Sequence, residues 1–188
     1  MLYLASKSPR RRQLLEQIGI DFEILDVEVP EIRGAGEPGI DYVSRVAREK
    51  AGAGLLQVVA VPGAIVMGAD TEVALNGEIF GKPTDANDAA GMLSRLAGRT
   101  HQVISVVWCI SAGQEDHAVS LSEVSIAPMD RACIDAYVAT GEAFGKAGAY
   151  AIQGRAGAFV SHLSGSYSGV MGLPLHETSL LLERFRAG

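Results

Sequence analysis

An aspartate and a lysine lie on either side of the turn in one predicted β-hairpin. Asp70 follows a short apolar run, and the alternating residues after it lead to Asn76-Gly77, the strongest short hairpin signal. Pairing about that turn brings Lys82 back towards Asp70 and Thr71. The hairpin therefore predicts that a carboxylate able to bind a metal ion or accept a proton shares one end of a sheet with a phosphate-binding cation.

Three arginines follow one another at the start of a predicted helix. Ser8 is a good N-cap and Pro9 suits the first helical position, so Arg10, Arg11 and Arg12 fall in the first turn. A helix N-terminus already carries partial positive charge, which disfavours cations there. The helical period directs Arg10 and Arg11 towards the interior and Arg12 towards solvent. Open amides beside two guanidinium groups predict a phosphate site.

Lys50 continues the apolar stripe of a second predicted helix. Tyr42, Val43 and Val46 define the stripe, and the helical period extends it to Lys50. A lysine in that position must either extend its amino group to solvent or find a counter-charge. Lys50 is therefore a second candidate phosphate ligand, with solvent exposure as the alternative.

Strands and helices alternate along the chain that must position these residues. The expected strands cover residues 2–5, 22–29, 71–75, 78–80, 103–110, 120–126 and 158–163. Three of the expected helices begin after their caps at Ser8, Asp85 and Asp130. Another contains Tyr42, and the last begins at Leu173-Pro174. This alternation predicts an α/β fold, and the hairpin makes its sheet mixed rather than all parallel. We therefore expect one domain, residues 1–188, with a mixed central sheet flanked by helices.

Composition excludes several classes of protein. The chain of 188 residues is 48% hydrophobic with a net charge of -6, which argues against disorder and against general nucleic-acid binding. No run approaches the roughly 18 apolar residues of a membrane span, and the apolar run at the N-terminus precedes its arginines, the reverse of a secretory signal. Cys109 and Cys133 have no metal-ligand spacing and are expected to be reduced thiols in the cytoplasm. His101 has no Ser or Cys nucleophile motif beside it and is expected to be structural.

Three common motifs are nearly matched, and the context rejects each. Residues 77–82 have one residue too few for a phosphate-binding loop, and Pro83 stands where Ser or Thr should bind the metal. Residues 34–39 spell GxGxxG, but polar residues separate them from the preceding strand and Glu37 stands where a pyrophosphate would bind. Residues 165–169 have tyrosine where a nucleophile elbow needs serine. These matches give no support to a Walker ATPase, a dinucleotide-binding protein or a serine hydrolase.

Six ordered motifs resemble those of the Maf family. They extend over nearly the whole chain and read SxSPRR from Ser6, GADT from Gly68, GKP from Gly81, GRTH from Gly98, GAYAIQG from Gly148, and GSYS through GLP from Gly165 to Pro174. The family consists of nucleoside triphosphate pyrophosphatases related in fold to inosine triphosphatase. The resemblance implies two lobes with a cleft between them, and it often goes with a homodimer.

The resemblance also implies a reaction and its residues. The substrate is cleaved between its α- and β-phosphates with a divalent metal, Mg²⁺ or Mn²⁺, and Asp70 is expected to accept the proton of the attacking water. Hard oxygen ligands such as Glu31 and Asp70 suit such a metal. The residues expected to bind substrate are Ser8, Arg10, Arg11, Lys50, Thr71, Lys82 and Gln153.

Three positions separate the groups within the family. Arg10, Thr71 and Gln153 resemble the group that acts on dTTP and UTP, with a house-cleaning role, whereas Trp, Gln and Glu at these places are typical of the group that prefers 7-methylguanosine triphosphate. Ser105 and Gly169 depart from the family pattern, which often has Thr and Asn there. A non-catalytic nucleotide-binding regulator of septum formation is the alternative from a different class.

Overall fold

The computed structural model describes residues 1–186, which form a mixed α/β fold. Within those residues a seven-stranded sheet has the order β2-β1-β3-β5-β6-β7, with β4 paired to β3. Strand β1 is parallel to β2 and to β3, and the other pairs are antiparallel. The strands are β1 (Leu2–Ala5), β2 (Glu23–Leu25), β3 (Ile65–Leu75), β4 (Glu78–Phe80), β5 (Thr100–Ile110), β6 (Glu115–Ile126) and β7 (Val160–Ser164).

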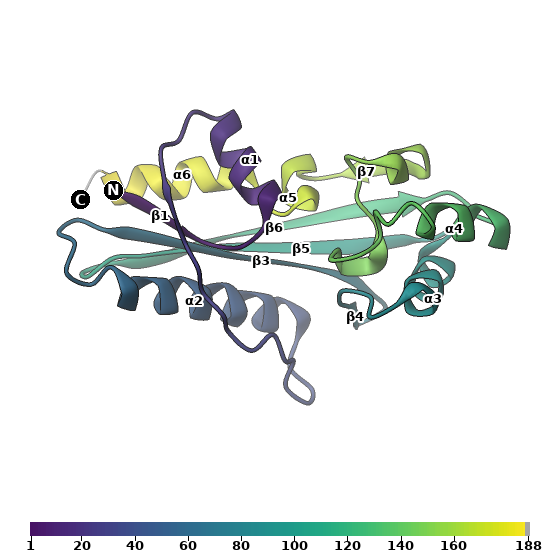
Figure 1. Cartoon of the computed structure of the whole chain (residues 1–188), viewed down its shortest axis with the longest axis horizontal. Coiled ribbons are helices and arrows are strands. Elements are labelled where there is room, and N and C mark those ends of the chain that lie inside the picture. The colour runs from purple at the N-terminus through teal and green to yellow at the C-terminus, as the bar shows by residue number, and fades with distance from the viewer. Residues whose placement is uncertain (187–188) are drawn as a thin grey trace.

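The helices divide the molecule into two lobes along the long strands β3, β5 and β6, which run through both (Figure 1). Helix α2 covers one face of the sheet at the N-terminal lobe, while α1 and α6 cover the opposite face of that lobe, and α3, α4 and the hairpin belong to the other lobe. The predicted mixed sheet flanked by helices is therefore confirmed. The helices are α1 (Pro9–Gln17), α2 (Gly39–Gln57), α3 (Ala86–Leu96), α4 (Arg131–Val138), α5 (Tyr167–Met171) and α6 (Leu175–Arg186), with short 3₁₀ helices η1 (Ala147–Ala149) and η2 (Arg155–Ala158).

Each lobe has its own apolar core. In the N-terminal lobe Leu4, Met67 and Leu181 are among the buried residues that join the sheet to α1 and α6. In the other lobe Val73 and Leu93 belong to a separate cluster. These cores lie towards opposite ends of the same long strands, and Met171 of α5 packs against both.

Several elements predicted from local residue patterns are confirmed. Asn76 and Gly77 both have positive φ, 52° and 82°, as a tight two-residue hairpin turn requires. The carboxylates of Asp85 and Asp130 accept hydrogen bonds from the amides of Asp88 and Cys133, so both predicted N-caps are confirmed.

Several elements differ from the predictions. Strand β3 begins at Ile65 rather than at residue 71, and β6 begins at Glu115 rather than at residue 120. The strand expected over residues 22–29 is only Glu23–Leu25, because it pairs with β1, which itself ends at Ala5. Beyond that point Asp26 and Glu28 lie beside Lys7 in exposed ion pairs instead. Helix α5 was not predicted, because five residues are too few to show a helical period.

Strand β3 has a gap in its pairing between the two lobes. On one edge of β3, β1 pairs with residues 65–67 and β4 pairs with residues 73–75, so neither covers residues 68–72. Helix α2 lies very close to this segment, since a Cβ at Gly68 would come within 2.3 Å of the Ala47 carbonyl oxygen. Glycine is therefore required there. Asp70 and Thr71, which point to opposite faces of the sheet, both border the gap.

Candidate active site

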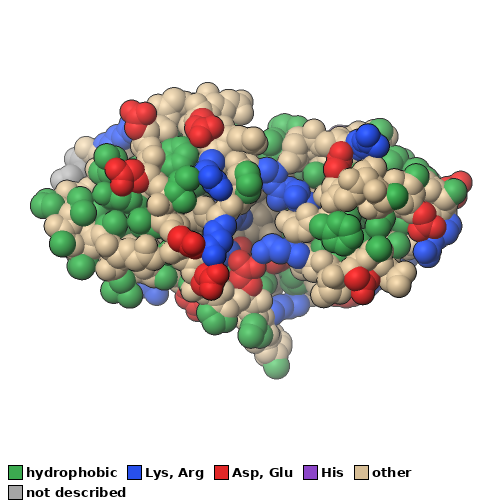
Figure 2. Space-filling view, viewed as in Figure 1, with side chains coloured by type: hydrophobic (Ala, Val, Ile, Leu, Met, Phe, Trp, Pro, Cys, Tyr) green, Lys and Arg blue, Asp and Glu red, His purple; other side chains and the backbone are tan. Residues whose placement is uncertain are grey.

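A cleft of about 660 Å³ lies between the lobes at the gap in β3. Figure 2 shows the hollow at the centre of this face of the molecule, with basic and acidic side chains gathered around it. The structure brings every site residue predicted from the sequence to the wall of this one cleft. They are Ser8, Arg10, Arg11, Glu31, Lys50, Asp70, Thr71, Lys82 and Gln153.

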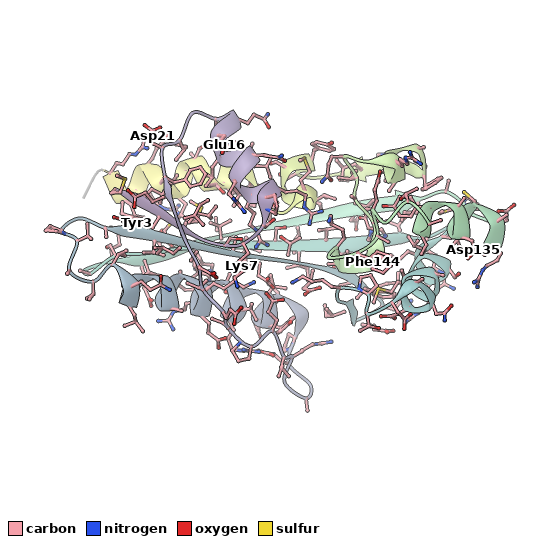
Figure 3. All side chains as sticks on the ribbon, viewed as in Figure 1. Tyr3, Lys7, Glu16, Asp21, Asp135 and Phe144 are labelled. Atoms are coloured by element: carbon pink, nitrogen blue, oxygen red, sulfur yellow. The ribbon has the colours of Figure 1, made fainter. Side chains whose placement is uncertain are left out.

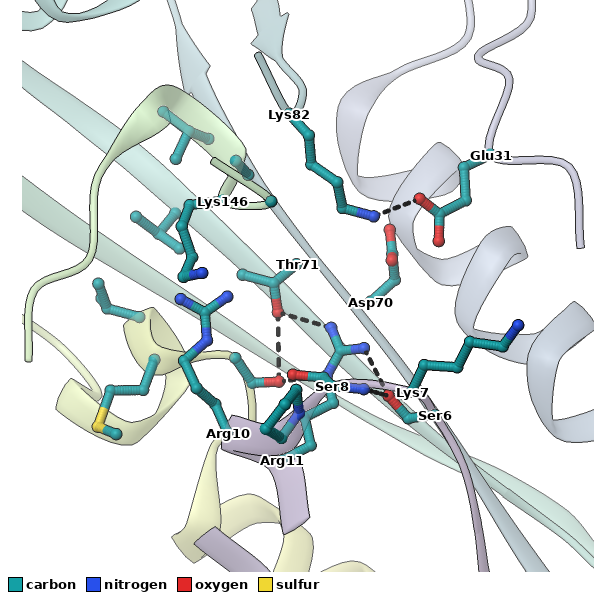
Figure 4. Close-up of a pocket in the computed structure, with 18 of the residues that line it drawn as sticks. Ser6, Lys7, Ser8, Arg10, Arg11, Glu31, Asp70, Thr71, Lys82 and Lys146 are labelled. Atoms are coloured by element: carbon teal, nitrogen blue, oxygen red, sulfur yellow. Dashed lines mark hydrogen bonds and ion pairs between the residues drawn. The ribbon is translucent and has the colours of Figure 1, made fainter. Parts of the chain in front are cut away.

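On the α2 side of the sheet, two lysines hold two carboxylates. Lys50 Nζ lies 2.6 Å from Glu31 Oε1 and 2.8 Å from Asp70 Oδ1. Lys82 Nζ lies 2.7 Å from Glu31 Oε2 (Figure 4). Of the two alternatives for Lys50, the structure shows the counter-charge, and it comes from two carboxylates of the protein. Although burial favours the protonated form of Glu31, hydrogen bonds from the two lysines lower the pKa of its carboxyl group to about 2. Glu31 therefore stays ionised at neutral pH.

Glu72 is a third carboxyl group on this side, which the sequence analysis did not single out. It lies two residues beyond Asp70 on the same face of β3 and is buried. Burial, and then the charge of Asp70, raise the pKa of Glu72 to about 8. The alternation Asp70-Thr71-Glu72 was the available signal, because strand residues two apart share a face.

On the other side of the sheet, Arg11 is buried and joins three elements. Its Nε donates to the Gly172 carbonyl oxygen at 2.8 Å, Nη1 donates to Ser6 Oγ at 3.2 Å, and Nη2 donates to Thr71 Oγ1 at 3.5 Å. Burial lowers the pKa of Arg11, and the charge of Asp70 opposes this shift. Thr71 Oγ1 also lies 2.9 Å from Ser105 Oγ. Arg11 points inward as predicted, and the hydroxyl of Thr71 is held by that guanidinium and by Ser105.

The start of α1 matches the prediction in most respects. Ser8 is the N-cap residue, but its side chain makes no capping hydrogen bond. Its hydroxyl therefore remains available to a ligand in the cleft. Arg10 lines the cleft and is half-buried, whereas Arg12 does not line it and donates to the Lys7 carbonyl oxygen. Arg12 is only half-exposed, so the expectation of a solvent position holds in part.

The Gly- and Ala-rich segment of the second lobe forms the far wall of the cleft. Gln153 is exposed there, and the buried Tyr150 also lines the wall. The Tyr150 hydroxyl lies 2.8 Å from His101 Nε2, and burial lowers the pKa of this histidine to about 4. His101 itself does not line the cleft, which agrees with its predicted structural role.

Two further lysines line the cleft and were missed. Lys7 belongs to the N-terminal lobe, and its amino group forms ion pairs with Asp26 and Glu28, whereas Phe144 lies on the other lobe (Figure 3). Lys146 lies on that second lobe, immediately before η1. Neither lysine lies on the apolar stripe of a predicted helix, as Lys50 does, or in the first turn of one, as the three arginines do. The sequence pattern therefore did not indicate that they line the cleft.

The residues present fit a divalent metal bound partly by substrate. Glu31 and Asp70 offer hard oxygen ligands, and Asp70 Oδ2 is buried without a hydrogen-bond partner. Among residues 1–186, no group of three or more His, Cys, Asp or Glu side chains is placed to hold a metal ion. A cation with two protein carboxylates would complete its shell with phosphate oxygens and water, as Mg²⁺ commonly does.

Comparison with known proteins places this cleft in a family. Among relatives, the "dTTP/UTP pyrophosphatase" of Xanthomonas euvesicatoria pv. vesicatoria is 56% identical over 189 residues, covering 100% of both chains. The "Nucleoside triphosphate pyrophosphatase" of Xylella fastidiosa strain 9a5c is 54% identical over 186 residues, covering 98% of each.

Among solved structures, the Ham1 protein of Staphylococcus aureus matches with a TM-score of 0.45 at 16% identity, covering 67% of this chain and 71% of that one. For residues 1–186, none of the helices has both the length and the apolar character needed to cross a membrane. The family model described as "Maf-like protein" matches residues 1–185. The chain therefore belongs to the Maf family.

Proposed function

We propose that this protein hydrolyses nucleoside triphosphates, with dTTP and UTP as preferred substrates, to the monophosphate and pyrophosphate. The observation that carries the proposal is the set of residues that line one cleft. Arg10, Arg11 and Lys82 line it together with the ion pair of Asp70 and Lys50. A triphosphate carries up to about four negative charges, and its cleavage requires cations and an oriented water. The names of the full-length relatives support the same reaction and the same bases.

Asp70 is suited to accept the proton of the attacking water. Its Oδ1 accepts from Lys50 at 2.8 Å, which fixes the carboxylate, while its Oδ2 has no partner. A water oriented by Oδ2 would attack the α-phosphorus and transfer a proton to that oxygen, as the bond to the bridging oxygen of the β-phosphate breaks. Asp70 thus combines a fixed position with a free lone pair.

Cationic side chains would neutralise the departing pyrophosphate. Arg11 and Lys82 approach the cleft from opposite faces of the sheet, and Ser8 offers an uncommitted hydroxyl beside them. A bound Mg²⁺ or Mn²⁺, held by Glu31 and Asp70, would polarise phosphate oxygens. Because Lys50 is already bound to both carboxylates, its part is to orient them as well as to face the phosphates.

We propose that Gln153 recognises the base of the nucleotide. Its amide oxygen can accept the N3–H of uracil or thymine while its NH₂ group donates to a ring carbonyl. A glutamate would instead accept two donors, as guanine presents. Gln153 is exposed on the cleft wall, so its amide oxygen and its NH₂ group are both free for this contact.

The proposed setting is the cytoplasm, with the nucleotide as partner and a homodimer as the assembly. Cys109 and Cys133 are both free thiols, which supports a reducing compartment. The homodimer rests on the family resemblance alone, and sedimentation equilibrium would test it.

The test is pyrophosphate release from a panel of nucleoside triphosphates with Mg²⁺, comparing wild type with Asp70→Asn. We expect turnover of UTP and dTTP, and a fall of about 10²- to 10⁴-fold in the variant, because asparagine keeps the shape but cannot accept the proton. Asp135→Asn, far from the cleft at the end of the second lobe, is the matched control and should keep full activity (Figure 3). Full activity in Asp70→Asn would remove Asp70 as proton acceptor.

The same panel separates the alternatives. Nucleotide binding without turnover by wild type would favour the regulator. Preference for 7-methylguanosine triphosphate over UTP would keep the reaction but overturn the base assignment.

A further inference from the structure

Two cations from different lobes face each other across the cleft. Arg10 lies in the first turn of α1, and Lys146 lies immediately before η1. Both line the cleft, and Figure 4 shows the guanidinium and amino groups pointing towards one another. The mechanism above does not use Lys146.

Arg10 and Lys146 differ from Lys7, Lys50 and Lys82, the other lysines of the cleft, because neither has a carboxylate partner. Lys50 and Lys82 are bound to Glu31, and Lys7 is bound to exposed acidic residues. Within residues 1–186, Arg10 makes no ion pair or side-chain hydrogen bond, and Lys146 Nζ donates only to the Phe144 carbonyl oxygen, at 3.1 Å. Their charges are therefore left for something else to neutralise.

The surroundings make these two charges costly when the cleft holds no anion. Burial, and then the neighbouring charge of Arg11, lower the pKa of Arg10. Burial, and then the charge of Arg10, lower the pKa of Lys146. Like charges brought together in a partly desolvated place repel one another more strongly than in water. An anion between them would convert that repulsion into two attractive contacts.

Glu142 is the nearest candidate for a counter-charge within the protein, and it is already engaged. It opposes the fall in the pKa of Lys146, but its Oε2 accepts the backbone amide of Arg155 at 2.8 Å. Its Oε1 also faces the Arg155 side chain, at 3.9 Å. Glu142 thus anchors the loop that follows Gln153 and makes no hydrogen bond to Lys146.

We propose that Lys146 is a further phosphate-binding residue, which holds a phosphate group of the nucleotide together with Arg10. This inference rests on the proposed function, since it names a contact of the same substrate. The subsite takes one residue from each lobe, so the bound phosphate joins the lobes across the gap. When substrate binds at this point, its phosphate attracts both Arg10 and Lys146 and so removes the repulsion between these two cations.

The test compares Lys146→Gln with Lys146→Arg, and uses Arg131→Gln as an exposed control from the same lobe that removes the same charge. Binding is measured by calorimetry with α,β-imido-UTP, a triphosphate that cannot be cleaved at the α–β bridge. We expect Lys146→Gln to weaken binding by about 10- to 100-fold, the usual effect of losing a charged hydrogen bond. Lys146→Arg should recover most of the affinity, and Arg131→Gln should match wild type.

Thermal unfolding separates binding from a structural role. Lys146→Gln removes a repulsion, so its melting temperature without nucleotide should equal or exceed that of wild type. A lowered melting temperature, or unchanged affinity for α,β-imido-UTP, would overturn the proposal, as would failure of wild type to bind the analogue. If wild type binds the analogue and Lys146→Gln does not, while UTP is not hydrolysed, the subsite stands and the proposed reaction fails.

Discussion

Replacing Lys50 by methionine would leave Asp70 as a buried carboxylate without its hydrogen-bond partner. The Lys50 and Asp70 side chains are 11% and 7% exposed, and their contact is 2.8 Å. Asp70 Oδ2 already lacks a partner, so the whole carboxylate would lose its compensation. Glu31 is affected less, because it keeps Lys82 and is 31% exposed.

The expected loss follows from this difference in burial. Removing one partner of a buried ion pair costs about 3–5 kcal/mol, and we expect Lys50→Met to fall at the low end, about 3 kcal/mol, because Glu31 keeps a cation. Asp70→Asn should cost about 1–2 kcal/mol, since the amide oxygen can still accept from Lys50. The double variant should cost less than the sum, giving a coupling free energy of about 1–2 kcal/mol.

Urea denaturation at pH 7 without divalent metal would measure all four proteins of the cycle. The control cycle is Arg131→Met with Asp135→Asn, which removes an ion pair of the same 2.8 Å length whose side chains are 70% and 51% exposed. An exposed pair at helical spacing is worth no more than about 0.5 kcal/mol. Coupling between Lys50 and Asp70 no larger than in this control would refute the argument that burial makes the Lys50 contact structurally important.

Two further predictions concern the second lobe. Gln153→Glu should lower kcat/KM for UTP and dTTP by about 10- to 100-fold, as expected for one mismatched polar contact, with an unchanged melting temperature because the side chain is exposed; equal turnover of all bases before and after would remove Gln153 from recognition. His101 has a pKa of about 4 in the folded protein against 6.5 when unfolded, so the unfolded state binds the proton first as pH falls. The stability of wild type relative to His101→Gln, measured in urea, should therefore fall by up to about 3 kcal/mol between pH 7 and pH 4, and a constant difference would contradict the buried neutral ring.

Local chemistry explains which elements could be predicted. The Asn76-Gly77 turn and the caps at Asp85 and Asp130 depend on residues within a few positions of one another, and all three are as expected. The strand after Phe22 was overestimated because its length depends on β1, a partner about twenty residues away. Propensity indicates that a segment can extend, but a strand ends where its neighbour ends.

The site shows the same division. A cation at an apolar position was a sufficient signal for Arg11 and Lys50, because a buried charge needs polar partners wherever the fold puts it. Arg11 is bound by a carbonyl oxygen and two hydroxyl groups, and Lys50 by two carboxylates. Lys146 carried no such signal, since nothing near it in the sequence shows that it faces Arg10. Glu72 alternates with Asp70 along β3, but the raised pKa of its carboxyl group follows from burial and from the charge of Asp70, which depend on the tertiary structure.

By itself, the sequence determined the chemistry: a carboxylate and a lysine about one hairpin, arginines on an open helix start, and six motifs in order. Only the tertiary structure decided that these groups share one cleft, because β1 ends at Ala5 and β4 begins pairing at Val73, which leaves one edge of β3 without a partner strand at Asp70 and Thr71. It also decided which charges are paired and which are not. Pairing depends on distances across two lobes, and no local pattern encodes those distances.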